Sequence, residues 1–297
     1  HTAVMAAARA HAGDVEVAQA VCGTLSNLAI AIDNRVPLVR DGAHTGIMAV
    51  ARGHRDNVKV VLVVCSTLRD LAVAADNAVQ LVRDGAHLAV RAVSHAHAGD
   101  VEVARSACGT LQNLASSSKV IGPLLRAGVH RIVMAVARCH SGDVEVARAA
   151  CSTLQSLSCA AFNTAMMVQN NVHKAAIAMA HVHANDAAVV RMACTVLRSL
   201  SEAVQNAVRL VRDGAHTMVI AAARTHYGDV EVVRGACHTL ANLAISPDVR
   251  VALTRDGART AAVTAIRGHA GEKEVVQRVI SMLSHLTGYV VVDILAY

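Results

Sequence analysis

The sequence predicts an all-α protein built as an array of stacked repeats. The first observation is a fixed period, because six cysteines follow one another at intervals of 43 residues. The second is composition: 54% of the 297 residues are hydrophobic, yet 1% are aromatic and only three are proline. Ala, Val and Leu favour closely packed helices, and self-similarity at a period of about 20–50 residues is typical of repeat architectures. The six cysteines are Cys22, Cys65, Cys108, Cys151, Cys194 and Cys237.

Each unit is predicted to hold three helices, as residues 42–84 illustrate. AHTGIMAVARGH follows Gly42 and is long enough for about three helical turns. A polar break at 54–57 separates it from a long apolar helix, VKVVLVVCSTLRDLAV, and a short helix, DNAVQLVRD, then runs to Gly85. Glycine just past a helix is a common left-handed terminator, so we expect positive φ in this column, with Asn171 as its substitute. The glycines are Gly42, Gly85, Gly128, Gly214 and Gly257.

Acidic and hydroxyl residues stand where the helices begin. Asp33, Asp76 and Ser246 are predicted to cap the short helix, with Pro247 at its first position. Aspartates also precede the long helix, where negative charge suits the positive end of the helix dipole. These aspartates are Asp14, Asp100, Asp143 and Asp229.

The units resemble the armadillo repeat. The resemblance is carried by the glycine before the second helix and by the third-helix cores TLSNLA (24–29), TLQNLA (110–115) and TLANLA (239–244). It covers essentially the whole chain and implies one right-handed α-solenoid of about seven three-helix units. HEAT repeats are the near alternative, but they have two helices per unit and lack the Gly-separated short helix. The expected units are residues 1–41, 42–84, 85–127, 128–170, 171–213, 214–256 and 257–297 of a single array, 1–297.

Both ends of the chain are apolar, whereas a solenoid needs polar caps. We therefore expect the chain to be a segment of a longer protein, or its ends to be covered by other subunits. Residues 288–297 predict one more short helix.

Small, polar and basic residues repeat on one face of the long helix. In armadillo folds the third helices line a concave groove, so the resemblance places this face there. Asparagine amides could hold the backbone of an extended peptide, and arginines in register suit carboxylate or phosphate. The alternative is a solvated helix face without a ligand. The predicted groove residues are Asn27, Asn113, Asn242, Arg69, Arg105, Arg148, Arg191, Arg198 and Arg234.

These features predict a non-catalytic scaffold that binds an extended acidic or phosphorylated peptide. Nuclear-import adaptors of the family carry Trp four residues before the Asn, but this chain has no Trp and places Gly23 and Gly109 there, so we expect no lysine-rich import signal as ligand. The alternative is a structural component of a large assembly, such as a ciliary axoneme or cytoskeletal complex, that uses its convex faces and ends. Because no catalytic triad, P-loop or paired-carboxylate motif stands out, neither an enzyme nor a cofactor is expected.

The spacing of the cysteines and histidines predicts structural roles for both. A disulfide needs Cα atoms within about 7 Å, whereas packed helices lie about 8–10 Å apart, so we expect small buried thiols and a reducing compartment, the cytoplasm. The 17 histidines fall mainly into two columns without zinc-site spacing, and the column ending the second helix suits its C-terminal dipole. The net charge of +6 favours anionic partners. Scarce aromatics argue against single-stranded nucleic acid, and the apolar runs are short for a membrane span.

Overall fold

The computed structural model describes residues 2–11, 13–159 and 163–287, and within these ranges it contains helices and no strand. The chain forms two compact units, His1–Leu157 and Ser158–Tyr297. Each unit repeats the predicted order of a short, a middle and a long helix. The short helix predicted at 288–297 lies outside the described residues.

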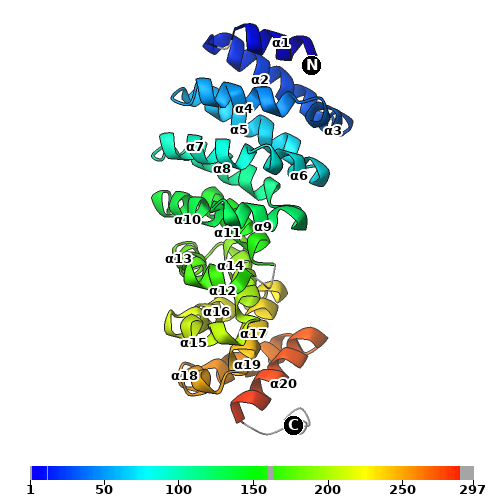
Figure 1. Cartoon of the computed structure of the whole chain (residues 1–297). Coiled ribbons are helices and arrows are strands. Elements are labelled where there is room, and N and C mark those ends of the chain that lie inside the picture. Colours follow the sequence, from blue (N-terminus) through cyan, green and yellow to red (C-terminus); the bar gives the residue numbers. More distant parts are fainter. Residues whose placement is uncertain (1, 12, 160–162, 288–297) are drawn as a thin grey trace. The chain divides into compact units, whose positions relative to one another are not determined.

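In the first unit, equivalent helices of successive repeats pack side by side in chain order (Figure 1). The middle helices are α1 (Thr2–Ala10), α4 (Ala43–Gly53), α7 (Ala86–Ala96) and α10 (Val129–Cys139). The long helices are α2 (Val15–Ile30), α5 (Val58–Ala72), α8 (Val101–Leu114) and α11 (Val144–Ser158). The short helices are α3 (Ile32–Arg40), α6 (Ala75–Arg83) and α9 (Ser118–Arg126).

The second unit repeats the pattern, with its long helices again packed in sequence. The middle helices are α13 (Val172–Val182), α16 (Ala215–Thr225) and α19 (Ala258–Gly268). The long helices are α14 (Ala187–Ser201), α17 (Val230–Ala244) and α20 (Lys273–Thr287). The short helices are α12 (Thr164–Gln169), α15 (Ala207–Arg212) and α18 (Arg250–Arg255), the last two preceded by the 3₁₀ turns η2 (Val204–Asn206) and η3 (Pro247–Val249).

A single left-handed residue turns the chain from each short helix into the next middle helix. The five predicted glycines have φ between 76° and 96°, and Asn171 has φ of 62°. This confirms the prediction, because glycine and asparagine are the residues that occupy this region at least cost. The uniform turn keeps every repeat the same length.

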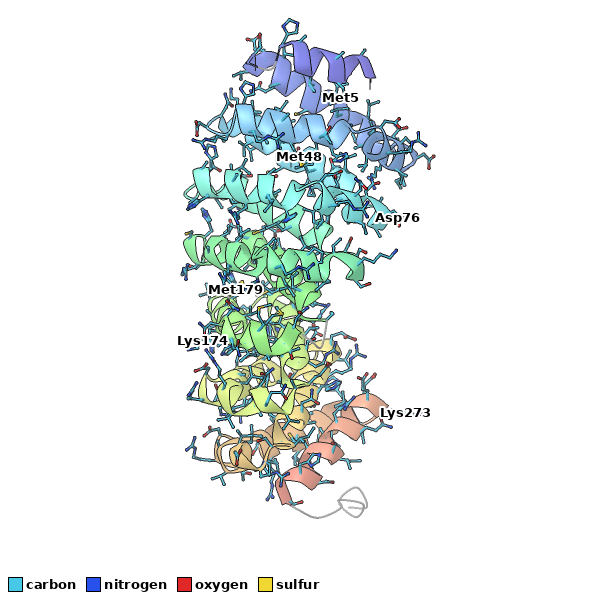
Figure 2. The ribbon with its side chains drawn as sticks, in the orientation of Figure 1. Met5, Met48, Asp76, Lys174, Met179 and Lys273 are labelled. Atoms are coloured by element: carbon cyan, nitrogen blue, oxygen red, sulfur yellow. The ribbon has the colours of Figure 1, made fainter. Side chains whose placement is uncertain are left out.

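The caps of the long helices are confirmed, since the carboxylates of Asp14, Asp100 and Asp229 each accept two backbone N–H bonds of the first turn. The prediction for the short helices is wrong at Asp33 and Asp76, which lie inside the first turn, after Ala31 and Ala74. Figure 2 shows Asp76 at the edge of its helix. Ser246 does precede η3 with Pro247 at its first position, but its side chain makes no capping bond.

Asparagines of the short helices bond to the end of the preceding long helix and do not cap the start of their own helix. The side-chain amide of Asn77 donates to the carbonyl oxygens of Leu71 and Arg35, at 2.9 and 2.8 Å. Asn34 and Asn206 make the equivalent bond to the preceding long helix. The bonds to Leu28, Leu71 and Leu200 satisfy carbonyls that the end of a long helix leaves without intrahelical partners, and the bond to Arg35 joins α6 to α3 of the preceding repeat.

The core lies between the long helices and the middle helices. One leucine column of the long helix is at most 1% exposed in six repeats. Small residues allow neighbouring layers to approach closely: a Cβ at Gly46 of α4 would collide with the terminal methyl of Met5 in α1, labelled in Figure 2. This packing explains how a chain almost without aromatics fills its core. The leucines are Leu25, Leu68, Leu111, Leu154, Leu197 and Leu240.

Candidate protein-binding groove

The predicted groove face of the first unit is a hollow of about 640 Å³ across α5, α8 and α11. Small residues leave the space, because Ser66 and Gly109 stand at the positions where import adaptors carry Trp. Arg69, Arg105 and Asn113, all predicted as groove residues, line it. We call this hollow the unit 1 groove.

Of the three predicted asparagines, Asn113 lines the unit 1 groove, and Asn113 and Asn242 both bond to the neighbouring repeat. Asn27 is exposed. The amide nitrogen of Asn113 donates to the backbone oxygen of Arg69 at 3.0 Å, and that of Asn242, which is buried, donates to the hydroxyl of Ser201 at 3.1 Å. Part of the expected ladder therefore holds repeats together, and Asn113 keeps its amide oxygen and one N–H for a ligand.

The structure does not present the four arginines in register as unpaired cations, because each one is bonded to a carboxylate. Arg105 donates to Asp143 of the next long helix at 2.5 Å and to Glu102 of its own helix at 2.6 Å. Arg148 donates to Glu145 at 2.6 Å. Each guanidinium remains partly exposed, 41% for Arg105 and 42% for Arg148.

The arginines of the second unit follow the same rule. Arg191 donates to Asp229 at 2.7 Å. Arg234 pairs with Glu231 of its own helix and, at 3.4 Å, with Glu274 of the next. The hydrogen bond from Arg191 helps to lower the pKa of Asp229 against the opposing effect of burial, which is the largest influence on that carboxyl. The hydrogen bond from Arg105 likewise lowers the pKa of Asp143.

The sequence-based prediction of a basic groove overlooked the acidic residues that pair with the arginines at 105, 148, 191 and 234. A glutamate precedes the arginine by three residues in GDVEVAR, so both lie on one face of the helix. The capping aspartate of the next repeat follows 38 residues after the arginine, as Asp143 follows Arg105. Both spacings are visible in the sequence, and together they indicate a groove of mixed charge.

The two remaining predicted arginines carry weaker contacts. A Cβ at Gly109 would lie 3.4 Å from Cδ of Arg69, so the stem of Arg69 extends over that glycine. Its guanidinium lies 3.7 Å from Asp70, within the range of a loose ion pair. Arg198 lies half-buried on α14.

The histidines hold successive repeats together. In the column that ends the middle helix, Nε2 of His97 lies 2.7 Å from the backbone oxygen of Arg55 in the preceding repeat, and His140, His226 and His269 repeat this bond. The structural role is therefore confirmed, but its main contact is a neighbouring carbonyl, which requires the Nε2–H tautomer.

The other histidine column forms buried His–Asp pairs that sequence reasoning missed. Nε2 of His44 donates to Asp84 at 2.7 Å, and His173 and His216 donate to Asp213 and Asp256 at 2.8 Å. The bond from His173 is the largest cause that lowers the pKa of Asp213. The signal was a constant offset of 40 residues between the two columns.

The six periodic cysteines are free and buried, as expected. Burial raises the pKa of five of their thiols to about 12, which keeps them protonated and unreactive: Cys22, Cys65, Cys108, Cys194 and Cys237. Buried threonines two residues further along join adjacent long helices, since Thr110 donates toward the backbone oxygen of Cys65 at 2.9 Å. Among the described residues, no group of His, Cys, Asp and Glu is arranged to hold a metal ion.

Within the described residues, no single helix has the length and apolarity to cross a membrane, although α9 and α10, bent by 76°, pass that test as a pair.

These features define an α-solenoid of three-helix repeats, with a groove across the long helices α5, α8 and α11 of the first unit. The family profile described as "LRRK2 ARM repeat" matches residues 89–265. The chain belongs to the armadillo-repeat family. A comparison with curated proteins gives no match.

Solved structures show the same fold. One comes from work on a conserved phosphorylation switch that controls the interaction between cadherin and β-catenin; it has a TM-score of 0.81 and 21% identity over 96% of this chain. This chain spans 55% of the length of that one. An engineered protein matches with a TM-score of 0.70 and 17% identity, covering 96% of this chain and 77% of its own. A second engineered protein has a TM-score of 0.66 and 19% identity, covering 77% and 92%. At these identities the likeness shows the fold alone.

Proposed function

We propose that this chain is a non-catalytic scaffold that binds an extended segment of a partner protein along the unit 1 groove. The supporting observation is the hollow across three successive long helices, lined by small and amide side chains. Armadillo-repeat folds are typical of protein-interaction scaffolds, and the fold is compatible with that role. The solved structure from work on the interaction between cadherin and β-catenin suggests the same class of partner, a protein.

Amide side chains in the groove can form hydrogen bonds with the backbone of a bound segment. An extended segment leaves its own N–H and C=O groups without partners, and Gln112 and Asn113 offer both donors and acceptors at the floor of the hollow. The space above Ser66 and Gly109 would receive the side chains of the bound segment. The guanidinium of Arg69, half-exposed and only loosely paired, can turn toward it.

The mixed charge of the groove still favours an acidic or phosphorylated segment. Glu102 and Glu145 are more than half exposed, and an exposed ion pair contributes only about 0–1 kcal/mol. A ligand carboxylate or phosphate can therefore replace these glutamates on Arg105 and Arg148 at small cost. Arg105 would keep its bond to Asp143, which orients its guanidinium.

The test is selection of twelve-residue peptides, with acidic and phosphorylated members, against the full chain. The Arg69→Ala, Gln112→Ala double variant should bind the selected peptides at least tenfold more weakly by fluorescence anisotropy. Arg55→Ala, an exposed residue of the turn between α4 and α5, is the matched control and should bind normally. Selection of basic peptides, or equal binding to both variants, would contradict the proposal.

A second candidate function is a structural role in a large assembly, such as a ciliary or cytoskeletal complex. It rests on exposed apolar residues of the second unit, Val204, Val208, Ile245 and Val251, of which Val251 is 80% exposed. Val208 and Val251 stand at equivalent positions of successive repeats, and exposed apolar side chains placed in this way suit a contact with another subunit. Val208→Ser with Val251→Ser should then abolish capture of the assembly from native cells, while the groove variant leaves it intact.

We propose a reducing compartment, the cytoplasm, as the site of action. The free, protonated thiols of the repeats support it, because such thiols persist where disulfides are not formed. Imaging of the tagged protein in its native cell would test this, and a location in an oxidising compartment would contradict it.

A further inference from the structure

A second cationic cluster lies on the long helices of the second unit. Arg198 of α14, His238 of α17 and Arg278 of α20 are all half-buried. His238 occupies the same repeat position as Ser66 and Gly109, and Arg198 the same position as Arg69. The cluster therefore lies on the face that forms the groove in the first unit, and α17 packs directly against both α14 and α20.

This cluster differs from the arginine column at 105, 148, 191 and 234, because its two arginines have no ion-paired carboxylate among the described residues. Neither Arg198 nor Arg278 forms an ion pair in the described part of the chain, whereas Arg191 and Arg234 do. Nδ1 of His238 is buried and has no hydrogen-bond partner there. Three groups able to bind an anion thus lie on three successive long helices, and the neighbouring carboxylate, Glu274, is engaged by Arg234.

The electrostatics of His238 agree with this arrangement. Burial, then the charges of Arg278 and Arg198, lower its pKa to about 4. Among the described residues, Glu274 of α20 is the charged group that raises the pKa of His238, and Glu274 is also engaged by Arg234 at 3.4 Å. The imidazole is consequently neutral at pH 7 and free to donate one hydrogen bond.

We propose that Arg198, His238 and Arg278 form a subsite for the phosphate monoester of a phosphorylated side chain in a bound protein segment. This inference deepens the proposed function and rests on it. Two guanidiniums without partners match the charge of such a group, about −1.5 to −2 at pH 7. A carboxylate carries half of that charge and would leave one arginine uncompensated. The forked donors of arginine also fit phosphate oxygens in pairs.

A protein segment is the occupant because the site lies on the groove face of consecutive long helices. A segment extended along that face would pass α14, α17 and α20 in turn and could place one phosphorylated residue over His238. One histidine with one arginine on each neighbouring long helix suits one phosphate group rather than a broad anionic surface.

The experiment follows the imidazole resonances of His238 in the full chain by NMR. The probe is N-acetyl-O-phosphoserine N-methylamide, compared with N-acetyl-aspartate N-methylamide. A bound anion favours the protonated imidazole, so the pKa of His238 should rise from about 4 by at least one unit with the phosphorylated probe and by less with the aspartate probe. Arg198→Gln and Arg278→Gln should each weaken binding at least tenfold.

Arg259→Gln removes an equivalent charge from an exposed site on α19 and serves as the matched control, with unchanged affinity expected. An unmoved His238 pKa at saturation, or equal affinity in all three variants, would overturn the subsite. If extended peptides still bound the unit 1 groove in that case, the proposed function would stand without this inference. Displacement of the probe by phosphoinositide vesicles through the same arginines would instead assign the site to a membrane headgroup and overturn the protein-segment occupant.

Discussion

Gly85 illustrates how one backbone position sets the path of the chain in each repeat. Its φ of +91° lies in the left-handed region, where a side chain with a Cβ is strained. An added Cβ would meet nothing closer than Cδ1 of Leu88, at 3.8 Å, so space is not the constraint. Any cost of replacing this glycine therefore comes from the backbone alone.

We predict that Gly85→Ala lowers the free energy of unfolding by about 1–2 kcal/mol, the cost of holding alanine at positive φ. Gly99→Ala is the matched control, because no atom lies within 4 Å of its added Cβ and its φ is not positive. Its effect should stay within about 0.5 kcal/mol. Urea denaturation of both variants measures the difference, and equal stability of the two would contradict the backbone argument.

His238 gives the chain a predictable acid sensitivity. Its folded pKa of about 4 lies below the value of about 6.5 expected in the unfolded chain, so the unfolded state binds more protons between these values. Its contribution to stability is therefore complete above pH 6.5 and is lost as the pH falls toward 4. Burial and the two neighbouring arginines cause this, because both disfavour the imidazolium.

We predict that His238→Gln reduces the loss of stability between pH 7 and pH 4.5. The urea midpoints of the wild type and of His181→Gln, a control at an exposed histidine of α13, should fall more over that interval than the midpoint of His238→Gln. A parallel fall in all three proteins would mean that the acid sensitivity arises at other groups.

At the scale of helices, Asp143 both caps one long helix and bonds it to the preceding long helix. Its carboxylate accepts the N–H of Val146 at 2.9 Å and so caps α11, and it accepts the guanidinium of Arg105 from α8. The cap fixes the start of one helix, and the ion pair fixes its position against the previous one. Asp229 forms the same two bonds: it accepts the backbone N–H of Val232 and the guanidinium of Arg191.

Two substitutions separate these roles. Asp143→Asn keeps a capping oxygen but loses the charge, so we predict a loss of about 0–1 kcal/mol. Asp143→Ala removes both and should cost about 1 kcal/mol more. Chemical denaturation of both variants provides the measurement. A loss in the asparagine variant as large as in the alanine variant would show that the ion pair dominates.

The same residues show why the sequence predicted the helices better than the groove. The left-handed turns and the aspartates at the start of the long helices follow from contacts within about one repeat, so spacing alone predicted them, although the caps predicted at Asp33 and Asp76 were wrong. The partner of Arg105 lies 38 residues away and that of His44 lies 40 away, and such pairs depend on how repeats stack. Asn242 lies on the predicted face, yet close packing at Ser201 buries it, which no single-helix pattern can reveal.

At the scale of the whole molecule, each of the two compact units is held together by contacts between neighbours in the repeat order. The long helix α8 packs against α5 and α7, and α17 packs against α14, α16 and α20. Contacts of this kind make stability a sum of repeat and interface contributions, without one shared core. A destabilising substitution in one repeat should therefore destabilise mainly that repeat and its immediate neighbours.

Leu111→Ala tests this expectation, because Leu111 is 1% exposed in α8 and the substitution should cost roughly 2–5 kcal/mol. Under native conditions, amide hydrogen exchange should accelerate at least tenfold in α5, α7 and α8 and remain unchanged in α17 and α20, since opening of one repeat exposes mainly its neighbours. Leu240→Ala in α17 should produce the reciprocal pattern. A uniform acceleration in both sets of helices would mean that the chain unfolds as a single cooperative body, and the nearest-neighbour account of its stability would then be wrong.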